Sequence, residues 1–372
     1  MKVIHIIVGL NIGGAENMLR RLLIESLSSG RYEHEVISLT DIGEVGQMLR
    51  HSGVRVSCLD MSSILSIPRV FFKLIRVMHN NRHAVVQTWM YHADLLGGLA
   101  SIISGNRRVV WNIRGTYIPQ EGISLTGVVI KFCKFLSHKV PAKIICCSEV
   151  ARNHHISLGY SQNNMEIIPN GYRIGDYSTN GLRSKIRGEL SIENDAIVVG
   201  TIGRLDPLKD YGNFMSAALK VIEKHPNVKF LMVGRGLEKG GRQLKKVTGF
   251  DFDMDNFILL GERRNVNRYL EAMDIYCMSS SSEGFPNAVC EAMAMRVPCV
   301  STDAGDAKNI VSSTGLIVPT KNYIALAEAL NDMISLKVSK RLDLGTKARM
   351  RIENNYSIDY VLRRYEKVYE KL

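Results

Sequence analysis

Residues 274–295 read DIYCMSSSSEGFPNAVCEAMAM, an apolar run followed by a polar loop and then by a second apolar run. The first run predicts a strand, and the last predicts a helix with Asn287 as its N-cap. Glu291 is the one charged residue of that helix. A carboxylate on an apolar helix is costly unless it is paired or hydrogen-bonded, so Glu291 needs either the ribose hydroxyls of a ligand or a cationic side chain.

The same alternation of short β-branched runs and longer amphipathic segments extends through the whole chain. Strands that alternate with helices predict parallel sheets with helices on both faces. The expected strands are 3–8, 34–39, 54–58, 84–88, 108–113, 143–147, 166–168, 197–202, 228–233, 256–260, 274–278, 298–301 and 316–318. The expected helices are 15–28, 66–80, 92–104, 124–139, 148–158, 210–224, 265–272, 287–295, 322–335 and 357–371.

A turn made by Pro169, Asn170 and Gly171 divides the chain. Its 372 residues are enough for two domains. We therefore predict an α/β protein with two Rossmann-like doubly wound domains, over 1–171 and 172–354. Ligands of such sheets bind at the carboxyl ends of the strands, so the cleft between the two domains is the expected site.

The composition excludes several classes of protein. With 45% hydrophobic and 23% charged residues, the chain is neither disordered nor fibrous. Its seven cysteines are odd in number, which favours buried thiols in a reducing compartment over a disulfide framework. No run reaches the ~18 apolar residues of a spanning helix, and the N-terminal run lacks the features of an export signal.

The net charge of +12 is unevenly distributed, because residues 51–150 contain 12 Lys and Arg but only 4 Asp and Glu. A basic surface of this kind suits nucleic acid, an anionic membrane or an anionic substrate.

Two loops have the composition of phosphate-binding loops. Gly13 and Gly14 follow the first strand and open a helix, where backbone N–H groups and the helix N-terminus favour a phosphate. This loop lacks the complete G-x-G-x-x-G pattern, so an ordinary turn is the alternative. Gly203 ends a strand and is followed by Arg204 and Lys209, two cations that either hold the oxygens of a diphosphate or are solvated.

Two other groups of residues could carry chemistry. His92 follows strand 84–88, where a histidine can be a general base, a sugar ligand or a packing residue. Asp251, Asp253 and Asp255 alternate as metal ligands can, but they precede a strand and so lie at the end away from the expected cleft. This position favours a solvated loop, and we expect no metal site.

Two helices in the basic segment combine cationic and apolar faces. Such helices lie on anionic lipid, or they pack on a sheet with a solvated outer face. Their occurrence together favours contact with an anionic membrane. In 66–80, Arg69, Lys73 and Arg76 are expected opposite Phe71, Phe72, Ile75 and Met78, and in 124–139, Lys131, Lys134 and His138 are expected beside Val128, Phe132, Phe135 and Leu136.

Taken together, these motifs resemble the signature of retaining glycosyltransferase family 4, group 1 type. The resemblance spans most of the chain and implies a GT-B fold, in which a C-terminal helix, here 355–372, packs back on the first domain. The landmarks are Gly13-Gly14-Ala15-Glu16, Ile168-Pro169-Asn170-Gly171, Gly203-Arg204 with Lys209, Val233-Gly234-Arg235-Gly236, Leu260-Gly261, and the frame from Glu283 to Asp303 that contains Glu283 and Glu291.

The resemblance also implies how a donor is held. The family usually takes a nucleotide-sugar, most often a UDP-sugar, and transfers the sugar with retention, without an essential metal or other cofactor. Arg204 and Lys209 would hold the diphosphate, and Glu291 would accept hydrogen bonds from the ribose. Sugar hydroxyls would contact Glu283, Phe285, Pro286 and Asn287, and the remaining donor-binding positions would be Gly13, Gly14, Gly203, Gly234, Gly261 and Arg263.

One position departs from the family pattern. Many members carry a histidine after the strand that corresponds to 108–113, whereas this chain has Arg114 and Gly115 there. Either Arg114 takes over that role or His92 contributes from the neighbouring strand. Retaining transfer of this class can proceed without a protein nucleophile, because a diphosphate oxygen can take the acceptor proton. The catalytic candidates are Glu283, Arg204, Lys209, His92 and Arg114.

We expect a cytoplasmic glycosyltransferase of the hexosyltransferase type, peripheral on the membrane. Its expected acceptor is a polyprenyl-diphosphate-linked intermediate of a surface polysaccharide such as O-antigen or capsule. A nucleotide-sugar epimerase of related fold is one alternative, and a non-catalytic homologue is another, although the intact motifs argue against the latter. A nucleic-acid-binding protein is a further alternative, but no nucleic-acid motif is present, so we expect no nucleic-acid partner.

Overall fold

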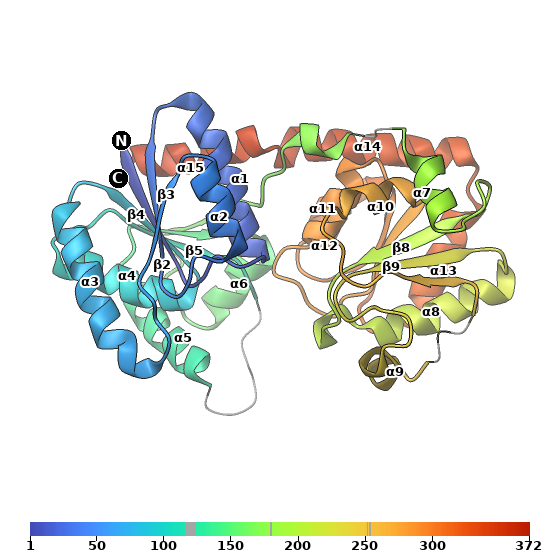
Figure 1. Cartoon of the computed structure of the whole chain (residues 1–372), viewed down its shortest axis with the longest axis horizontal. Coiled ribbons are helices and arrows are strands. Elements are labelled where there is room, and N and C mark those ends of the chain that lie inside the picture. Colours follow the sequence, from blue (N-terminus) through green and yellow to red (C-terminus); the bar gives the residue numbers. More distant parts are fainter. Residues whose placement is uncertain (117–123, 179–180, 251, 253) are drawn as a thin grey trace. The chain divides into compact units, whose positions relative to one another are not determined.

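The computed structural model describes residues 1–116, 124–178, 181–250, 252 and 254–372 (Figure 1). It divides the chain into two compact units. The first unit consists of Met1–Tyr172 and Tyr356–Leu372, and the second unit consists of Arg173–Asn355. Each unit has a parallel sheet and a hydrophobic core of its own.

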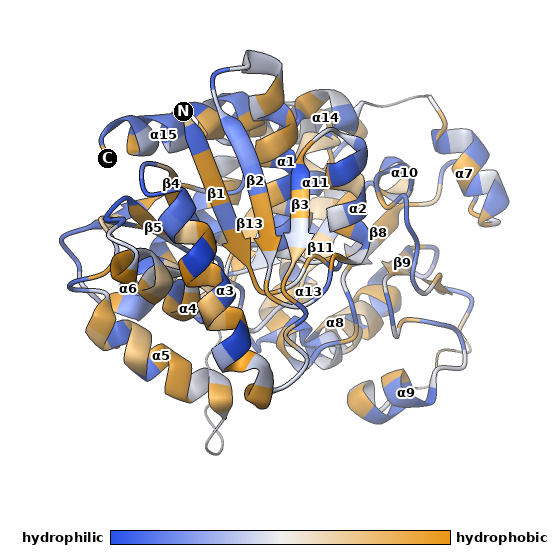
Figure 2. Ribbon diagram, turned by 60° about the vertical axis from the view of Figure 1, so that its left-hand side comes forward, coloured by the Kyte–Doolittle hydropathy of each residue, from blue (hydrophilic) through white to orange (hydrophobic). Residues whose placement is uncertain are grey.

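The first unit is built on a seven-stranded parallel sheet. The helices around it are banded in hydrophobic and hydrophilic colours in Figure 2, as expected for amphipathic helices that pack on a sheet. In spatial order the strands are β3 (Arg55–Cys58), β2 (Glu33–Ser38), β1 (Lys2–Ile7), β4 (Val85–Trp89), β5 (Val109–Ile113), β6 (Lys143–Cys146) and β7 (Met165–Ile167). The helices are α1 (Gly14–Ser29), α2 (Gly43–His51), α3 (Ile67–Asn80), α4 (Tyr91–Ile103), α5 (Leu125–Leu136), α6 (Glu149–Ser157) and α15 (Ile358–Glu370).

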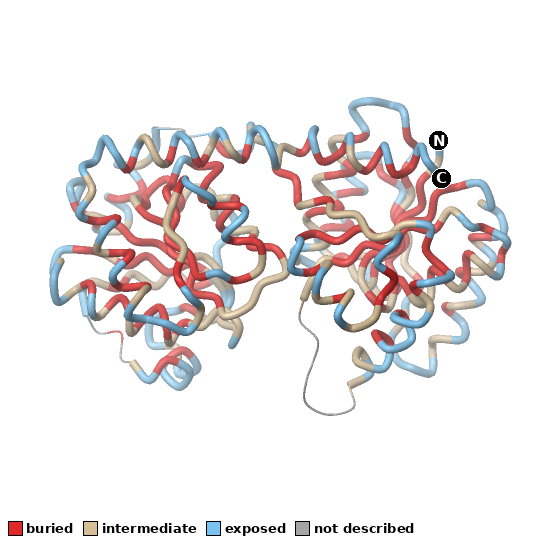
Figure 3. The backbone as a smooth tube through the Cα atoms, turned by 180° about the vertical axis from the view of Figure 1, so that it is seen from behind, coloured by how far each residue is buried: buried red, intermediate tan, exposed pale blue. Residues whose placement is uncertain are grey.

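The second unit is built on a six-stranded parallel sheet. Figure 3 shows the interior of each unit as buried and the outer turns of the helices as exposed. In spatial order the strands are β10 (Phe257–Leu259), β9 (Lys229–Val233), β8 (Val198–Ile202), β11 (Ile275–Met278), β12 (Cys299–Thr302) and β13 (Leu316–Val318). The helices are α7 (Arg183–Glu189), α8 (Tyr211–Lys224), α9 (Arg242–Thr248), α10 (Asn267–Ala272), α11 (Asn287–Ala294), α12 (Ala307–Val311), α13 (Tyr323–Ser335) and α14 (Val338–Tyr356).

Each sheet reverses its strand order at one place. In the first unit β1 pairs with β2 on one side and with β4 on the other, and in the second unit β8 pairs with β9 and with β11. At such a switch point the loops after the two central strands diverge and leave a crevice at the carboxyl ends, where ligands bind. The two sheets confirm the prediction of two Rossmann-like domains.

The C-terminal helix α15 belongs to the first unit. It packs against α1, and Ile358, Val361 and Tyr365 join the core of that unit. Arg31 reaches across to the Glu370 carboxylate at 2.8 Å. The last helix of the chain therefore covers the sheet that the first strands form.

Every expected strand and helix is present, but two details of the prediction are wrong. Asn287 is the first residue of α11, and Pro286 occupies the N-cap position without a side-chain hydrogen bond. Within the described residues, the structure also contains five helices that the pattern did not predict, namely α2, α7, α9, α12 and α14. Four of them have nine residues or fewer, and α14 buries few large apolar side chains.

Candidate functional site

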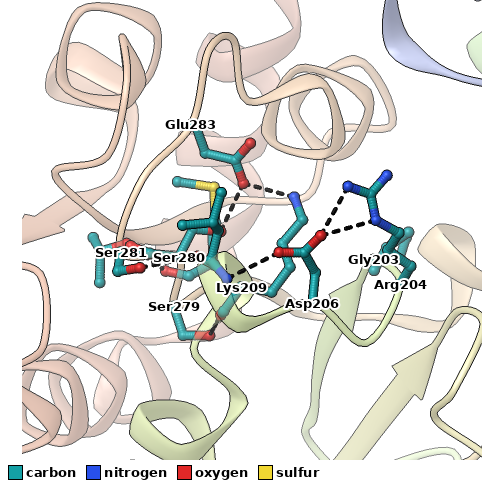
Figure 4. Close-up of polar contacts among 12 residues, drawn as sticks. Gly203, Arg204, Asp206, Lys209, Ser279, Ser280, Ser281 and Glu283 are labelled. Atoms are coloured by element: carbon teal, nitrogen blue, oxygen red, sulfur yellow. Dashed lines mark hydrogen bonds and ion pairs between the residues drawn. The ribbon is translucent and has the colours of Figure 1, made fainter. Parts of the chain in front are cut away.

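The switch point of the second unit brings together two charged residues that lie far apart in the sequence. Lys209 ends a short 3-10 turn (Pro207–Lys209) after β8, and Glu283 lies in the loop after β11. The Lys209 Nζ atom lies 2.6 Å from Glu283 Oε1. A dashed line marks this contact in Figure 4. Ser280 Oγ donates a second hydrogen bond, of 2.7 Å, to the same oxygen. These three side chains form a polar cluster at the carboxyl edge of the sheet.

The two loops that carry this cluster are hydrogen-bonded to each other, once between their backbones and once from a side chain to a backbone carbonyl. The Ser281 amide donates to the Leu208 carbonyl at 2.8 Å, and Ser279 Oγ donates to the Lys209 carbonyl at 2.8 Å. Tyr211 OH donates to the Gly203 carbonyl at 2.8 Å, which holds the end of β8. Burial raises the pKa of Tyr211, so the hydroxyl keeps its proton and remains a donor. The position of Lys209 is therefore fixed by both loops.

Arg204 lies at the same edge but is paired locally. Its Nε and Nη2 atoms lie 3.0 and 2.8 Å from Asp206 Oδ2. Burial alone would raise the pKa of Asp206, but the Leu208 amide and the Arg204 guanidinium lower it below its usual value. The side chain of Arg204 is 64% exposed, so this pair contributes little to stability and leaves the guanidinium within reach of solvent.

Three glycines, Gly203, Gly234 and Gly261, follow the carboxyl ends of β8, β9 and β10 beside the cluster. The Gly203 amide donates to the Val233 carbonyl at 3.0 Å, and the Gly234 amide donates to the Gly261 carbonyl at 2.8 Å. Gly234 has a φ of 147°, and a Cβ atom there would lie 2.0 Å from the Gly203 oxygen. Only glycine fits at Gly234, so the carboxyl ends of β8, β9 and β10 present main chain in place of side chains.

The other donor-site candidates of the second unit differ in how far they are buried. Phe285 and Pro286 are buried at the entry to α11, and Asn287 and Glu291 are half-buried within that helix. Lys209, Tyr211, Glu283 and Pro286 help to line a cavity of about 10 Å³, which is room for one water molecule. Arg263 is exposed and donates to the carbonyl of its neighbour Glu262 at 3.0 Å.

The glycine loop of the first unit differs from its expected form in one respect. Gly13 is the extended N-cap of α1, and Gly14 is the first helical residue. The Glu16 carboxylate folds back over Gly13, where a Cβ atom would lie 2.2 Å from Glu16 Oε2. Burial raises the pKa of Glu16, and the hydrogen bond to its own backbone amide opposes that rise. The N-terminus of α1 therefore already holds a carboxylate, which the pattern of glycines did not indicate.

The two catalytic candidates of the first unit have different surroundings. His92 is half-buried in the first turn of α4, and burial lowers its pKa, so the imidazole is neutral and can accept a proton. The guanidinium of Arg114, at the end of β5, donates to Asn112 Oδ1, the Ile168 carbonyl and Tyr365 OH at 3.2 Å each. It also donates to the side chain of Asn170. Arg114 is thus engaged by the protein itself.

The site candidates fall into two groups, one in each unit. Within the described part of the chain, no three His, Cys, Asp or Glu side chains cluster as metal ligands do. Of the three alternating aspartates, Asp251 and Asp253 lie outside the described residues.

Two family models match the chain. Residues 12–174 match the model described as Glycosyltransferase Family 4, and residues 196–335 match the model described as Glycosyl transferases group 1. The chain belongs to glycosyltransferase family 4, group 1 type. It is therefore a transferase enzyme, and its two parallel-sheet domains have the GT-B architecture.

Two relatives of this glycosyltransferase are named as glycosyltransferases themselves, one of them for capsular polysaccharide biosynthesis. The chain is 24% identical over 321 residues to the Staphylococcus aureus capsular polysaccharide biosynthesis glycosyltransferase CapM, with 82% of each chain covered. It is 24% identical to the Escherichia coli UDP-Gal:alpha-D-GlcNAc-diphosphoundecaprenol alpha-1,3-galactosyltransferase, with 80% of this chain and 76% of the relative covered.

Solved structures share the fold of this glycosyltransferase. Anabaena Alr3699/HepE in complex with UDP superposes with a TM-score of 0.86 at 20% identity over 100% of both chains. TarM superposes with a TM-score of 0.74 at 12% identity, with 99% of this chain and 98% of that chain covered. Likeness at this level of identity concerns the fold alone.

Proposed function

We propose that the enzyme transfers a hexose, with retention, from a UDP-sugar to a polyprenyl-diphosphate-linked saccharide during synthesis of a surface polysaccharide. The observation that carries the donor site is the Lys209–Glu283 pair, a cation and a carboxylate 2.6 Å apart at the switch point of the second unit. Lys209 binds the diphosphate together with Arg204, and Glu283 accepts hydrogen bonds from the donor sugar with the help of residues 285–287. Glu291 accepts hydrogen bonds from the ribose.

The arrangement suits a reaction in which the leaving group carries the charge. The bond between the anomeric carbon and the β-phosphate oxygen breaks, and UDP departs with the electron pair. The acceptor oxygen bonds to the same face of the anomeric carbon, and its proton passes to a phosphate oxygen. Lys209 and Arg204 offset the charge that develops on the diphosphate, which is the largest contribution that a preorganised site makes. No metal or cofactor enters this scheme.

In the first unit we assign the place beside the acceptor to His92 rather than to Arg114. His92 is neutral and half-buried at the switch point, where it can accept a hydrogen bond from a hydroxyl group. The guanidinium of Arg114 is already engaged by four protein groups. Gly13 and Gly14 let the backbone of the first unit approach the donor, once the Glu16 carboxylate has turned aside.

The names of two similar proteins support the choice of substrates. The Escherichia coli relative is named for UDP-Gal and for a diphosphoundecaprenol-linked acceptor, and the structure of Anabaena Alr3699/HepE holds UDP. We infer that this chain also takes a UDP-sugar and an acceptor on a lipid diphosphate. A nucleotide-sugar epimerase would instead release UDP-sugar isomers without an acceptor, so product analysis separates the two activities.

The donor site can be tested by binding alone. We expect UDP to raise the Tm of the enzyme and GDP to raise it less, with no change on addition of EDTA. Glu291→Ala should weaken UDP binding about tenfold or more, because a hydrogen bond to a charged group is worth about 1.5–3 kcal/mol. Calorimetric titration measures the Kd. Glu328→Ala, an exposed change on α13, is the matched control. Equal Kd values for both variants would remove Glu291 from the site.

A lipid-linked acceptor requires access to a membrane, and the first unit has a surface suited to one. Within the described residues no helix is long and apolar enough to cross a bilayer. α3 and α5 both pack beside α4, and each exposes aromatic side chains next to cations. Phe132 and Phe135 on α5 are 59% and 67% exposed, and Phe72 on α3 is 70% exposed. We propose that these exposed sides of α3 and α5 form a membrane face that lies on anionic lipid at the cytoplasmic side. Its cations are Lys131 and Lys134 on α5, Lys139 just after α5, and Arg69, Lys73 and Arg76 on α3.

The structure corrects one detail of this surface. Phe72 lies on the exposed side with the cations and not opposite them. α3 buries Val70, Leu74 and Met78. Phe72 is two residues from both Val70 and Leu74, which places it on the opposite side of the helix. The correction adds an aromatic side chain to the basic face, and aromatic side chains beside cations are typical of helices that lie in the membrane interface.

Flotation with vesicles tests the membrane face. We expect the enzyme to float with vesicles that contain anionic lipid and to dissociate partly at high salt, because cations contribute about 1 kcal/mol each near such a surface. Phe132→Ser with Phe135→Ser should lower the bound fraction several-fold, because about 0.8 kcal/mol is lost per buried CH2 equivalent. Val338→Ser with Leu342→Ser removes two exposed apolar side chains from α14 and serves as control. An equal loss in both pairs would contradict the assignment of this face.

A further inference from the structure

The segment at the end of β12 packs against the loop that carries Glu283. β12 runs parallel to β11, and its last residue, Thr302, lies one position past the end of β11 in their shared register. We name residues 302–306 the β12 edge, and residues 279–286, which follow β11, the β11 loop. None of the donor-binding or catalytic candidates lies on the β12 edge, so this edge borders the candidate site from outside.

The hydroxyl group of Thr302 holds the backbone of the β11 loop. Its Oγ1 atom lies 2.6 Å from the Ser280 carbonyl oxygen and 3.3 Å from the Met278 carbonyl oxygen. A hydroxyl group has one proton, so it donates mainly to the nearer Ser280 carbonyl. Thr302 is fully buried and Ser280 is 1% exposed, so loss of the hydroxyl would take the donor away from a buried carbonyl.

Ser280 in turn holds the carboxylate of Glu283. Its Oγ atom donates to Glu283 Oε1 at 2.7 Å, and Lys209 contacts the same oxygen. Ser280 is thus held by Thr302 through its backbone, and it holds Glu283 through its side chain. Thr302 therefore acts on the orientation of the carboxylate through one intermediate residue.

Gly305 restrains the backbone at Glu283. Its φ is 58°, and a Cβ atom there would lie 2.8 Å from the Glu283 carbonyl oxygen and 3.0 Å from Glu283 Cβ. The β12 edge comes this close to Glu283 because the position lacks a side chain. Thr302 and Gly305 together restrain the carboxylate and the backbone of the same residue.

We propose that Thr302 and Gly305 are positioning residues that hold Glu283 in place for the hydroxyl groups of the donor sugar, and that they thereby set which sugar the enzyme prefers. The inference rests on the proposed function, in which Glu283 accepts hydrogen bonds from that sugar. Both residues act through Glu283 and not by contact with the reacting atoms.

The charge on the donor makes this support necessary. In the structure the ammonium of Lys209 holds Glu283 Oε1 at 2.6 Å, but under the proposed function it turns to the diphosphate. Glu283 then loses one of its restraints at the moment when it has to meet the sugar. A group that is already in position contributes more than one that must be ordered first. The bonds from the β12 edge do not involve Lys209, so they persist when the donor binds.

Binding of UDP, UDP-glucose and UDP-galactose tests the proposal, because the two sugars differ only in the orientation of one hydroxyl group. Thr302→Val removes the hydroxyl and keeps the shape of the side chain. We expect the Kd of the better-bound UDP-sugar to rise about tenfold and that of UDP to change less than about twofold, because a hydrogen bond from the sugar to a carboxylate is lost. The preference between the two sugars should shrink. Thr302→Ser keeps the hydroxyl and should restore most of the preference.

Gly305→Ala tests the second support. The added methyl group would press on the backbone at Glu283, so we expect the same change in sugar binding as for Thr302→Val. The double variant should show less than the sum of both effects, because both substitutions act on one residue. Calorimetric titration of the whole enzyme measures each Kd.

Two matched controls lie elsewhere in the second unit. Thr314 is 7% exposed and donates from its hydroxyl to the Val311 carbonyl at 2.7 Å, just before β13, at the opposite edge of the sheet. Gly249 has a φ of 75°, but a Cβ atom there would meet no atom within 4 Å. Thr314→Val and Gly249→Ala should leave all three Kd values unchanged.

Several results would overturn the proposal. Equal losses in Thr302→Val and Thr302→Ser would show that the hydroxyl does not carry the effect. An equal rise in the Kd of UDP and of the UDP-sugars would mean that the β12 edge supports the whole site and not Glu283 in particular. Unchanged sugar binding in both Thr302→Val and Gly305→Ala would remove the β12 edge from donor recognition.

Failure of the proposed function would look different. The natural enzyme would then bind neither UDP-sugar more tightly than UDP, and hydrogen exchange would decide the role of Thr302. Amides of residues 280–284 should exchange about tenfold faster in Thr302→Val than in Thr314→Val if Thr302 holds the β11 loop. Equal exchange in these two variants would show that it does not.

Discussion

Replacement of Lys209 by methionine is expected to lower kcat about 10²–10³-fold, the loss that follows removal of one preorganised group at a developing oxyanion. Methionine keeps most of the length and apolar stem of lysine, so the change removes the charge with little change in packing. Lys209 is 28% exposed and is held by two loops, so its position does not depend on the ammonium alone. Steady-state assays with a UDP-sugar and a lipid-linked acceptor measure the effect.

The Lys209–Glu283 ion pair leads to a second expected effect of this substitution, on the binding of UDP. In the structure the ammonium of Lys209 faces Glu283, whose carboxylate also accepts from Ser280. Under the proposed function, we expect Lys209 to turn its charge to the phosphate oxygens when a diphosphate binds, which would leave Glu283 available to sugar hydroxyls. Lys209→Met should therefore weaken binding of UDP as well as turnover. Lys220→Met, an exposed change on α8, is the matched control. A Lys209→Met enzyme with normal kcat would remove this residue from the donor site.

The sequence predicts the strands of this fold well because each one is a short, β-branched run. It predicts α14 poorly for an equally physical reason. α14 has 19 residues, and its fully buried positions are Arg341, Gly345, Ala348 and Ile352. Ile352 is the one large apolar side chain among these four, and Leu344 packs on the core only partly buried. Arg341 is buried by donating to the carbonyls of Ile334 and Leu336. Such backbone partners cannot be inferred from hydrophobic periodicity.

The same limit applies to the candidate site. The motifs identify Lys209 and Glu283 separately, and the strand order of a doubly wound sheet predicts that the loops after β8 and β11 meet. The 2.6 Å contact between them depends on the register of those strands and on the loop bonds, which only the structure supplies. The sequence shows that Arg114 stands where many family members carry a histidine. It cannot show that Arg114 donates to Asn170 and Tyr365, which lie 56 and 251 residues away in the chain.

A second large effect concerns pH and a buried polar chain in the first unit. Trp89 Nε1 lies 3.3 Å from His5 Nδ1, His5 Nε2 lies 3.0 Å from His34 Nδ1, and His34 Nε2 lies 2.8 Å from Ser26 Oγ. An indole N–H can only donate, so His5 accepts at Nδ1 and donates from Nε2, and His34 in turn donates to Ser26. Both rings are neutral in this arrangement, and an added proton would place one donor opposite another.

Acidification is therefore expected to destabilise the first unit. Burial lowers the pKa of His5, and His34 adds to that effect. Burial lowers the pKa of His34 from 6.5 to about 4, with a contribution from the N-terminal ammonium. The unfolded chain binds the proton near pH 6.5 and the folded chain near pH 4, so the free energy of unfolding falls as the pH falls between these values. For His34 alone the loss reaches about 3 kcal/mol at pH 4.

Both tryptophans of the chain, Trp89 and Trp111, lie in the first unit, so urea unfolding followed by tryptophan fluorescence reports on this unit. His34→Gln removes the titrating ring, and its free energy of unfolding should fall by about 3 kcal/mol less than that of the natural protein between pH 7 and pH 4. His79→Gln, an exposed change on α3, should leave the pH dependence as it is. If the free energy of unfolding fell equally with pH for the natural protein and His34→Gln, protonation of His34 would cost no stability. That result would contradict the donor and acceptor assignment made from Trp89 to Ser26.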